Sequence, residues 1–109
     1  MKTTYREIVE ASGGMSKLLD LKLKPAKAIA LARLCKQLNE ELQLFKEAQM
    51  RITGGTTEAD LQRQFDELLA VEVEIPGEKF VFTFDEVESI DAGTVMATEP
   101  FVTIEEGTA

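Results

Sequence analysis

The fold is decided by one uninterrupted stretch, residues 25–52, which reads PAKAIALARLCKQLNEELQLFKEAQMRI. It opens with a proline, which suits the first turn of a helix because the missing N–H would have no partner there. No glycine and no further proline follow within the stretch. The sequence therefore predicts one long helix from Pro25 to about Ile52, with a length of about 42 Å at 1.5 Å per residue.

One face of this helix carries a heptad seam. Its members recur at alternating steps of four and three residues: Leu31, Cys35, Leu38, Leu42, Phe45, Gln49 and Ile52. The seam predicts the buried face, and it assigns Cys35 to core packing rather than to a reactive thiol. Ile29 and Leu44 fall on the other side of the helix at 100° per residue. Scattered exposed apolar residues are common, and the alternative is a second face for contact with a protein partner.

The residues before Pro25 predict a first, shorter helix, capped by Thr4 and ending at about Asp20. Its length of about 25 Å cannot cover the long helix from end to end. Gly13 and Gly14 mark either a break in this helix or a place where a second backbone packs very close. Together the two helices predict an antiparallel helical hairpin over residues 1–53.

A third helix is predicted over residues 56–70, after a stop at Gly54–Gly55 and with Thr56 or Thr57 as its cap. Its apolar side consists of Leu61, Phe65, Leu68 and Leu69. If this helix runs back along the uncovered end of the long helix, the core closes within one chain. If it points elsewhere, another subunit must cover the long helix.

Residues 71–104 change to the period of two that is typical of strands. Val71, Val73 and Ile75 alternate with Glu72 and Glu74, Pro76-Gly77 breaks the run, and Phe80, Phe82 and Phe84 alternate again. The pattern predicts an antiparallel β-hairpin with acidic residues on one face and aromatic residues toward the helices. Residues 101–104 predict a third strand after a loop or helical turn at 91–99, and residues 105–109 a loose tail. The expected fold is α+β, with a small C-terminal antiparallel β-sheet, in a single domain of residues 1–109.

The net charge of −8 is unevenly distributed. Residues 1–54 carry a net charge of +4, and residues 55–109 carry −12. An acidic surface can serve solubility alone. The alternative is that the basic end of one subunit attracts the acidic end of its neighbour, head to tail. On this reading the candidate protein-contact residues are Lys24, Lys27, Glu72 and Glu74, in addition to Ile29 and Leu44.

The sequence predicts no catalytic residue, cofactor, metal or small-molecule substrate. There is no histidine, which removes the commonest general base and transition-metal ligand. Asp85, Glu86, Glu88 and Asp91 do not have the spacing of a calcium-binding loop. Direct nucleic-acid binding by the acidic half is not expected because like charges repel.

The same reasoning bears on the compartment. No apolar run approaches the ~20 residues of a membrane span, and the N-terminus lacks a signal peptide's apolar stretch. Cys35 is the only cysteine, which fits a reducing cytoplasm. We therefore expect a cytoplasmic protein that makes no membrane contact.

The order of features carries a family resemblance. Its segments are 15–19 (MSKLL), 23–28 (LKPAKA), 38–42 (LNEEL), 65–75 (FDELLAVEVEI) and 99–102 (EPFV). In these the chain resembles a family of short uncharacterised proteins, a domain of unknown function, encoded by tailed bacteriophages and prophages. The resemblance implies a phage origin, with the host-cell cytoplasm or the virion as location, and a non-enzymatic role. It implies no particular binding residue.

The leading hypothesis is therefore a phage or prophage protein that acts by protein–protein contact, in virion assembly or as a homo-oligomeric accessory factor. The alternative is an acidic inhibitor of a host defence or nucleic-acid enzyme that mimics phosphate groups.

Overall fold

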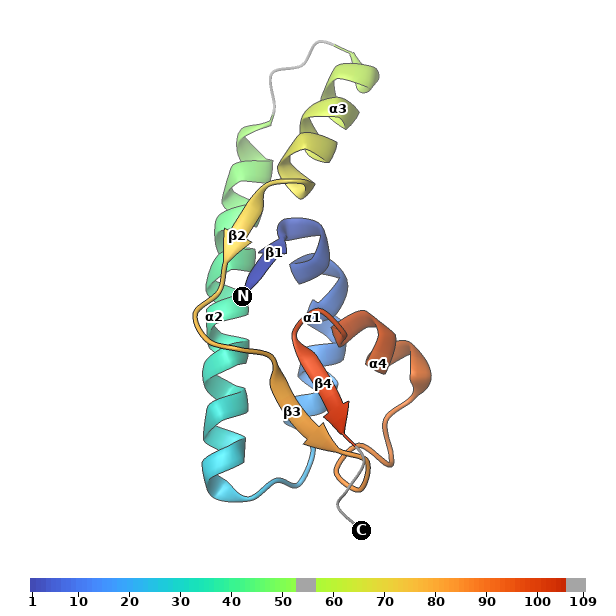
Figure 1. Ribbon diagram of the computed structural model, residues 1–109. Coiled ribbons are helices and arrows are strands. Elements are labelled where there is room, and N and C mark those ends of the chain that lie inside the picture. The colour runs from blue at the N-terminus through green and yellow to red at the C-terminus, as the bar shows by residue number, and fades with distance from the viewer. Residues whose placement is uncertain (53–56, 106–109) are drawn as a thin grey trace.

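The computed structural model describes residues 1–52 and 57–105. Figure 1 shows an elongated molecule, with principal extents of 58 × 24 × 21 Å. Its radius of gyration of 16.1 Å exceeds the ~13 Å of a compact chain of this length. The elements follow the order β1 (Lys2–Thr4), α1 (Tyr5–Leu19), α2 (Pro25–Arg51), α3 (Glu58–Leu69), β2 (Glu72–Glu74), β3 (Phe80–Thr83), α4 (Ala92–Thr98) and β4 (Val102–Glu105).

The three predicted helices are confirmed, together with their N-terminal signals. The Thr4 side chain accepts a hydrogen bond from the Glu7 N–H at 3.4 Å and caps α1. α2 begins at Pro25, as predicted. The Thr57 side chain accepts from the Asp60 N–H at 3.1 Å and caps α3. The predicted stop at Gly54–Gly55 lies outside the described residues.

The helices close around α2 within one chain. α1 and α2 form the predicted antiparallel hairpin, and α3 runs back along the C-terminal part of α2 (Figure 1). The Phe45 ring of α2 lies 6.0 Å from the Phe65 ring of α3 and 5.5 Å from the Tyr5 ring of α1, measured between centroids. Of the two predicted alternatives for α3, the structure therefore shows the one in which the long helix is covered by its own chain.

The mixed α+β class is confirmed, but the predicted β-hairpin and antiparallel C-terminal sheet are wrong. β2 pairs antiparallel with β1, with Thr3 opposite Val73. β3 pairs in parallel with β4, with Phe80 opposite Val102. Parallel neighbours need a long crossover connection, and the segment that contains α4 supplies it. The predicted helical turn at 91–99 is thus a helix within the crossover connection between the two parallel strands.

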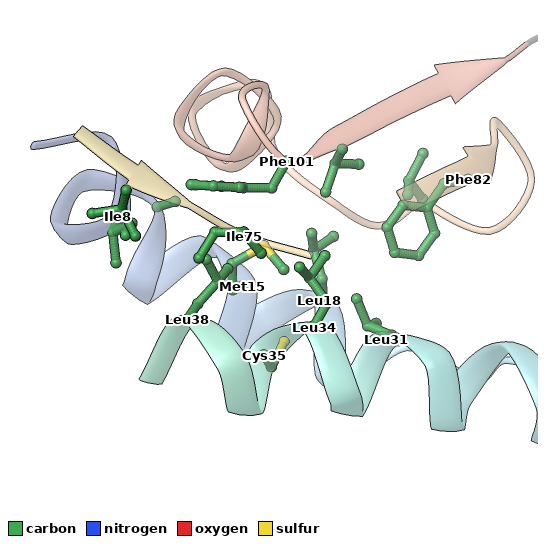
Figure 2. Close-up of a cluster of buried hydrophobic side chains, with 14 residues drawn as sticks. Ile8, Met15, Leu18, Leu31, Leu34, Cys35, Leu38, Ile75, Phe82 and Phe101 are labelled. Atoms are coloured by element: carbon green, nitrogen blue, oxygen red, sulfur yellow. The ribbon is translucent and has the colours of Figure 1, made fainter. Parts of the chain in front are cut away.

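The hydrophobic core lies between α1, α2 and the strands. Figure 2 shows side chains from α1, α2, β3 and the segments that follow β2 and α4 meeting in this layer. The labelled residues are Ile8, Met15, Leu18, Leu31, Leu34, Cys35, Leu38, Ile75, Phe82 and Phe101. Leu31, Cys35, Leu38 and Phe45 of the predicted seam are buried, and Leu34 is buried beside them. The prediction is wrong for Gln49, which is exposed, while Leu42 and Ile52 are only partly buried. The predicted inward orientation is wrong for Phe84, which follows directly after β3 and is 53% exposed.

Gly13 and Gly14 do not break α1, which continues through both residues. Gly14 is buried against α4, and a Cβ atom placed there would lie 2.8 Å from Cγ2 of Thr98. Gly13 faces open space. The second predicted alternative, close packing of another backbone, is therefore confirmed for Gly14.

Candidate functional site

The outward side of α2 is the surface on which the predicted contact residues meet. α2 turns its buried side chains, from Leu31 to Phe45, toward the core. At 100° per residue, an arc of about 60° on the opposite side holds Ala26 near the start of the helix and Glu47 and Arg51 near its end. Between these lie four side chains of the same arc: Ile29, Arg33, Glu40 and Leu44. All four are exposed, with Ile29 at 54% and Leu44 at 53%. We call these four residues the α2 outer stripe.

The α2 outer stripe combines apolar and charged side chains. Ile29 and Leu44 lie at its ends, about 22 Å apart along the helix axis at 1.5 Å per residue. Arg33 and Glu40 lie between them and form no ion pair within the described part of the chain. The sequence reasoning selected only the two apolar residues. The same helical period also places Arg33 and Glu40 on this face, because Arg33 follows Ile29 by four residues and Glu40 precedes Leu44 by four.

Lys24 and Lys27, at the N-terminal end of α2, have different environments. Lys24 is exposed, and its side chain makes no capping hydrogen bond. Lys27 donates to Oε1 of Glu86, and its ammonium lies 5.8 and 5.7 Å from the ring centroids of Phe80 and Phe82. Lys27 therefore holds β3 against α2 within the chain, which leaves Lys24 as the exposed member of this candidate pair.

The carboxylate of Glu86 is organised by its surroundings. Oε1 also accepts a hydrogen bond from the Thr83 N–H at 2.8 Å. Partial burial acts to raise the pKa of Glu86, but the hydrogen bonds from Lys27 and Thr83 and the charge of Lys27 outweigh it and lower this pKa. The ionised form of Glu86 is thus favoured in the folded state.

Replacing Lys27 with methionine is expected to lower the free energy of unfolding by about 1 kcal/mol at neutral pH, because a partly buried ion pair is lost while the apolar stem remains. Lys24→Met is the matched control, since Lys24 lies three residues away on the same helix end and is exposed. Urea denaturation measures both variants. Equal losses for the two would show that the Lys27–Glu86 contact contributes nothing specific.

The same contact gives a pH dependence with a defined sign. A carboxyl group with a lowered folded-state pKa stabilises the fold above its unfolded pKa, and that contribution disappears as the pH falls through the folded value. The difference between the wild-type chain and Lys27→Met should therefore be constant near neutrality. It should shrink below the ordinary glutamate pKa of 4.5.

Glu72 and Glu74 are exposed on β2. Oε1 of Glu74 lies 3.4 Å from the N-terminal amine of Met1. Lys17 and Asp91 form a further pair at 3.5 Å. These two pairs and Lys27–Glu86 all join the basic first half of the sequence to the acidic second half.

The two halves of the sequence therefore do not form two separate ends of the molecule. β1 from the first half pairs with β2 from the second half, and β3 and β4 lie toward the N-terminal end of α2 (Figure 1). Basic residues of the first half of the sequence thus lie beside acidic residues of the second half in the folded chain. The structure consequently brings Ile29 and Leu44 onto one face but does not bring Lys24, Lys27, Glu72 and Glu74 into one site.

Two of the four acidic residues of the 85–91 segment, Asp91 and Glu86, have structural roles. Asp91 caps α4 by accepting from the Thr94 hydroxyl at 2.7 Å and from the Thr94 N–H at 3.1 Å, and these hydrogen bonds lower the pKa of Asp91. Glu86 binds Lys27, while Asp85 and Glu88 are exposed. Over residues 1–52 and 57–105, no three histidine, cysteine, aspartate or glutamate side chains are grouped so that they could hold a metal ion.

Neither the hollow between α2 and α3 nor Cys35 adds a candidate catalytic or binding site among the described residues. An open hollow of about 770 Å³ lies between the C-terminal part of α2 and α3. Among its described lining residues Glu58 is the only ionisable one. Cys35 is buried in the core, and burial raises the pKa of its thiol to about 11.

Within the described part of the chain, no helix is long and apolar enough to cross a membrane. Comparisons with protein-family models, with curated proteins and with solved structures give no match.

Proposed function

We propose that this chain is a non-enzymatic phage or prophage protein that acts by protein–protein contact and self-associates. It would act in virion assembly or serve as a homo-oligomeric accessory factor. The observation that carries the proposal is the α2 outer stripe. Two large apolar side chains, Ile29 and Leu44, lie half-exposed on one face of the longest helix, on the side turned away from the core.

The physical reason is the exposed apolar area. Removing apolar surface from water contributes about 25 cal/mol per Å², and both side chains keep more than half of their surface accessible. A partner that covers them gains this free energy without any change in the fold. α2 is also the longest helix, about 40 Å for its 27 residues, so it offers a long surface for another helix.

The alternative, an acidic inhibitor that mimics phosphate groups, has one supporting feature. Glu72 and Glu74 are both exposed and lie two residues apart on β2, so their side chains leave the same face about 6.6 Å apart. Three acidic residues of the second half are, however, engaged by cations of the first half. We therefore rank this role below self-association. It requires a basic binding partner whose affinity for the chain falls when Glu72 and Glu74 become glutamine.

Sedimentation velocity of the full chain at micromolar to several hundred micromolar protein tests self-association. We expect a reversible shift to larger species with increasing concentration. Ile29→Ser and Leu44→Ser should each move the equilibrium toward monomer. Met96→Ser is the control, because Met96 is 72% exposed but lies on α4. A wild-type chain that stays monomeric over the whole range would contradict self-association.

A further inference from the structure

We infer that the α2 outer stripe binds the same stripe of a second copy of this chain, with the two α2 helices antiparallel and a two-fold axis between Lys36 and Gln37. The inference rests on the proposed self-association and names its geometry. In a two-fold contact the same patch is used twice, so each residue that faces a partner is faced in turn by its counterpart. The stripe must therefore be complementary to itself when one helix is reversed.

The spacing of the stripe meets this condition. In an antiparallel pair, the numbers of two facing residues have a constant sum. When Ile29 faces Leu44 of the second copy, that sum also places Arg33 opposite Glu40 of the second copy. One register thus pairs the two apolar residues with each other and the two opposite charges with each other. By symmetry every contact occurs twice, which gives two apolar pairs at the ends and two ion pairs inside them.

Other arrangements of the same two faces are less favourable. In a parallel, in-register pair, Arg33 would face Arg33 and Glu40 would face Glu40, so that like charges oppose. Sliding the antiparallel pair by four residues places Arg33 opposite Lys36 in one direction and opposite Leu44 in the other. Sliding it by seven residues pairs Arg33 with Glu47, but it places Glu40 opposite itself and Ile29 opposite Arg51. Charge complementarity fixes register and orientation in helix pairs more strongly than it raises affinity, and among these alignments it favours the one that pairs Ile29 with Leu44.

The central residues are compatible with this alignment. The two-fold axis passes between Lys36 and Gln37, which lie at opposite margins of the stripe at 100° per residue. Each Lys36 precedes Glu40 of its own helix by four residues, a spacing at which opposite charges attract. The contact is small, because a single pair of helices meeting over about four turns buries less than the ~1,200 Å² of a standard stable interface. The dimer should consequently be weak and dependent on concentration.

Charge exchange gives the first test. Arg33→Glu and Glu40→Arg each place like charges at two positions of the dimer and should each raise the dissociation constant about tenfold or more. The double variant with both changes restores opposite charges and should return to within about threefold of the wild type. Lys24→Glu is the matched control, because Lys24 is an exposed cation at the N-cap of α2 and lies outside the stripe. Sedimentation equilibrium measures the four variants and the wild-type chain.

Disulfide formation gives the second test. Ile29→Cys and Leu44→Cys are prepared as separate full chains and oxidised alone and as a mixture. The inferred register brings position 29 beside position 44 of the second copy and keeps identical positions about 22 Å apart along the axis, far beyond the reach of a disulfide. The mixture should therefore give a cross-linked heterodimer and each variant alone should not. Cys35 is buried and does not compete.

The outcomes separate this inference from the proposed function. If the wild-type chain self-associates but the charge variants behave like Lys24→Glu, the antiparallel stripe contact is wrong and self-association stands. Cross-linking of Ile29→Cys with itself would also overturn the inference, since it indicates a parallel pair. A wild-type chain that never self-associates removes the proposed function together with its geometry.

Discussion

Replacing Phe82 with alanine is expected to lower the free energy of unfolding by about 3–5 kcal/mol, the usual cost of removing a fully buried aromatic side chain. Phe82 is 0% exposed. Its ring lies 4.7 Å from the ring of Phe80 between centroids, and the Lys27 ammonium lies over it. Small domains have a total stability of about 5–15 kcal/mol, so the variant should unfold at much lower denaturant concentration.

Phe84→Ala is the matched control. It removes the same side chain two residues further along, where the structure leaves 53% of the residue exposed. We expect a loss within about 1 kcal/mol, since most of that surface stays in water in the folded state. Guanidinium denaturation measures the loss of unfolding free energy in the two variants. Equal losses would favour the orientation that the alternating sequence predicts, in which Phe80, Phe82 and Phe84 all face the helices.

This contrast shows where the sequence was informative. The helices were predictable because their signals are local. Thr4, Pro25 and Thr57 mark the helix starts, and the seam of α2 selected Leu31, Cys35 and Leu38 as buried, as the structure confirms. A period of 3.6 residues with a capping residue is a property of one segment, and it does not depend on what that segment packs against.

The strand pairing could not be predicted in the same way. Alternation identifies a strand but not its neighbour, and each sheet here joins segments that are distant along the chain. β2 pairs with Lys2–Thr4, a strand of three residues whose own pattern is too short to detect. The N-terminal amine of Met1 donates to the carbonyl oxygen of Ile75 at 2.6 Å, so the chain start itself completes this ladder.

The residues of the candidate site were predictable to the same extent: those set by local helical period were, and those set by long-range packing were not. Ile29 and Leu44 could be placed on the outer side of α2 because their positions follow from the helical period alone. The role of Lys27 could not, because its partner Glu86 is 59 residues away in the sequence and is brought there by the position of β3. A charged residue near a helix start is therefore a poor guide to intermolecular contact until the packing of the remaining chain is known.

The largest further effect is expected at the contact between α1 and α4, where Gly14→Ala should cost about 1–3 kcal/mol through overpacking. The added Cβ would lie 2.8 Å from Cγ2 of Thr98 and 3.4 Å from the carbonyl oxygen of Thr94. The Thr98 methyl group cannot easily rotate away. Its hydroxyl donates to the Thr94 carbonyl oxygen at 2.8 Å, and the residue is only 1% exposed.

At the neighbouring residue, Gly13→Ala is expected to raise the free energy of unfolding rather than lower it. A Cβ at Gly13 meets nothing within 4 Å, and alanine favours a helix over glycine by about 1 kcal/mol. Gly13→Ala should therefore stabilise the chain by up to about that amount. Two stabilising substitutions, measured by thermal and urea denaturation, would show that α4 does not pack closely on α1.

Thr98→Ser identifies the atom responsible. Serine removes the Cγ2 methyl group and keeps the hydroxyl that bonds to Thr94. The loss caused by Gly14→Ala should therefore be smaller in a Thr98→Ser background than in the wild-type chain, and the double-mutant cycle measures this difference. Some cost should persist, because Cγ2 of Thr94 would still lie 3.3 Å from the new Cβ. If the two substitutions are instead additive, the destabilisation arises elsewhere than at the Gly14–Thr98 contact.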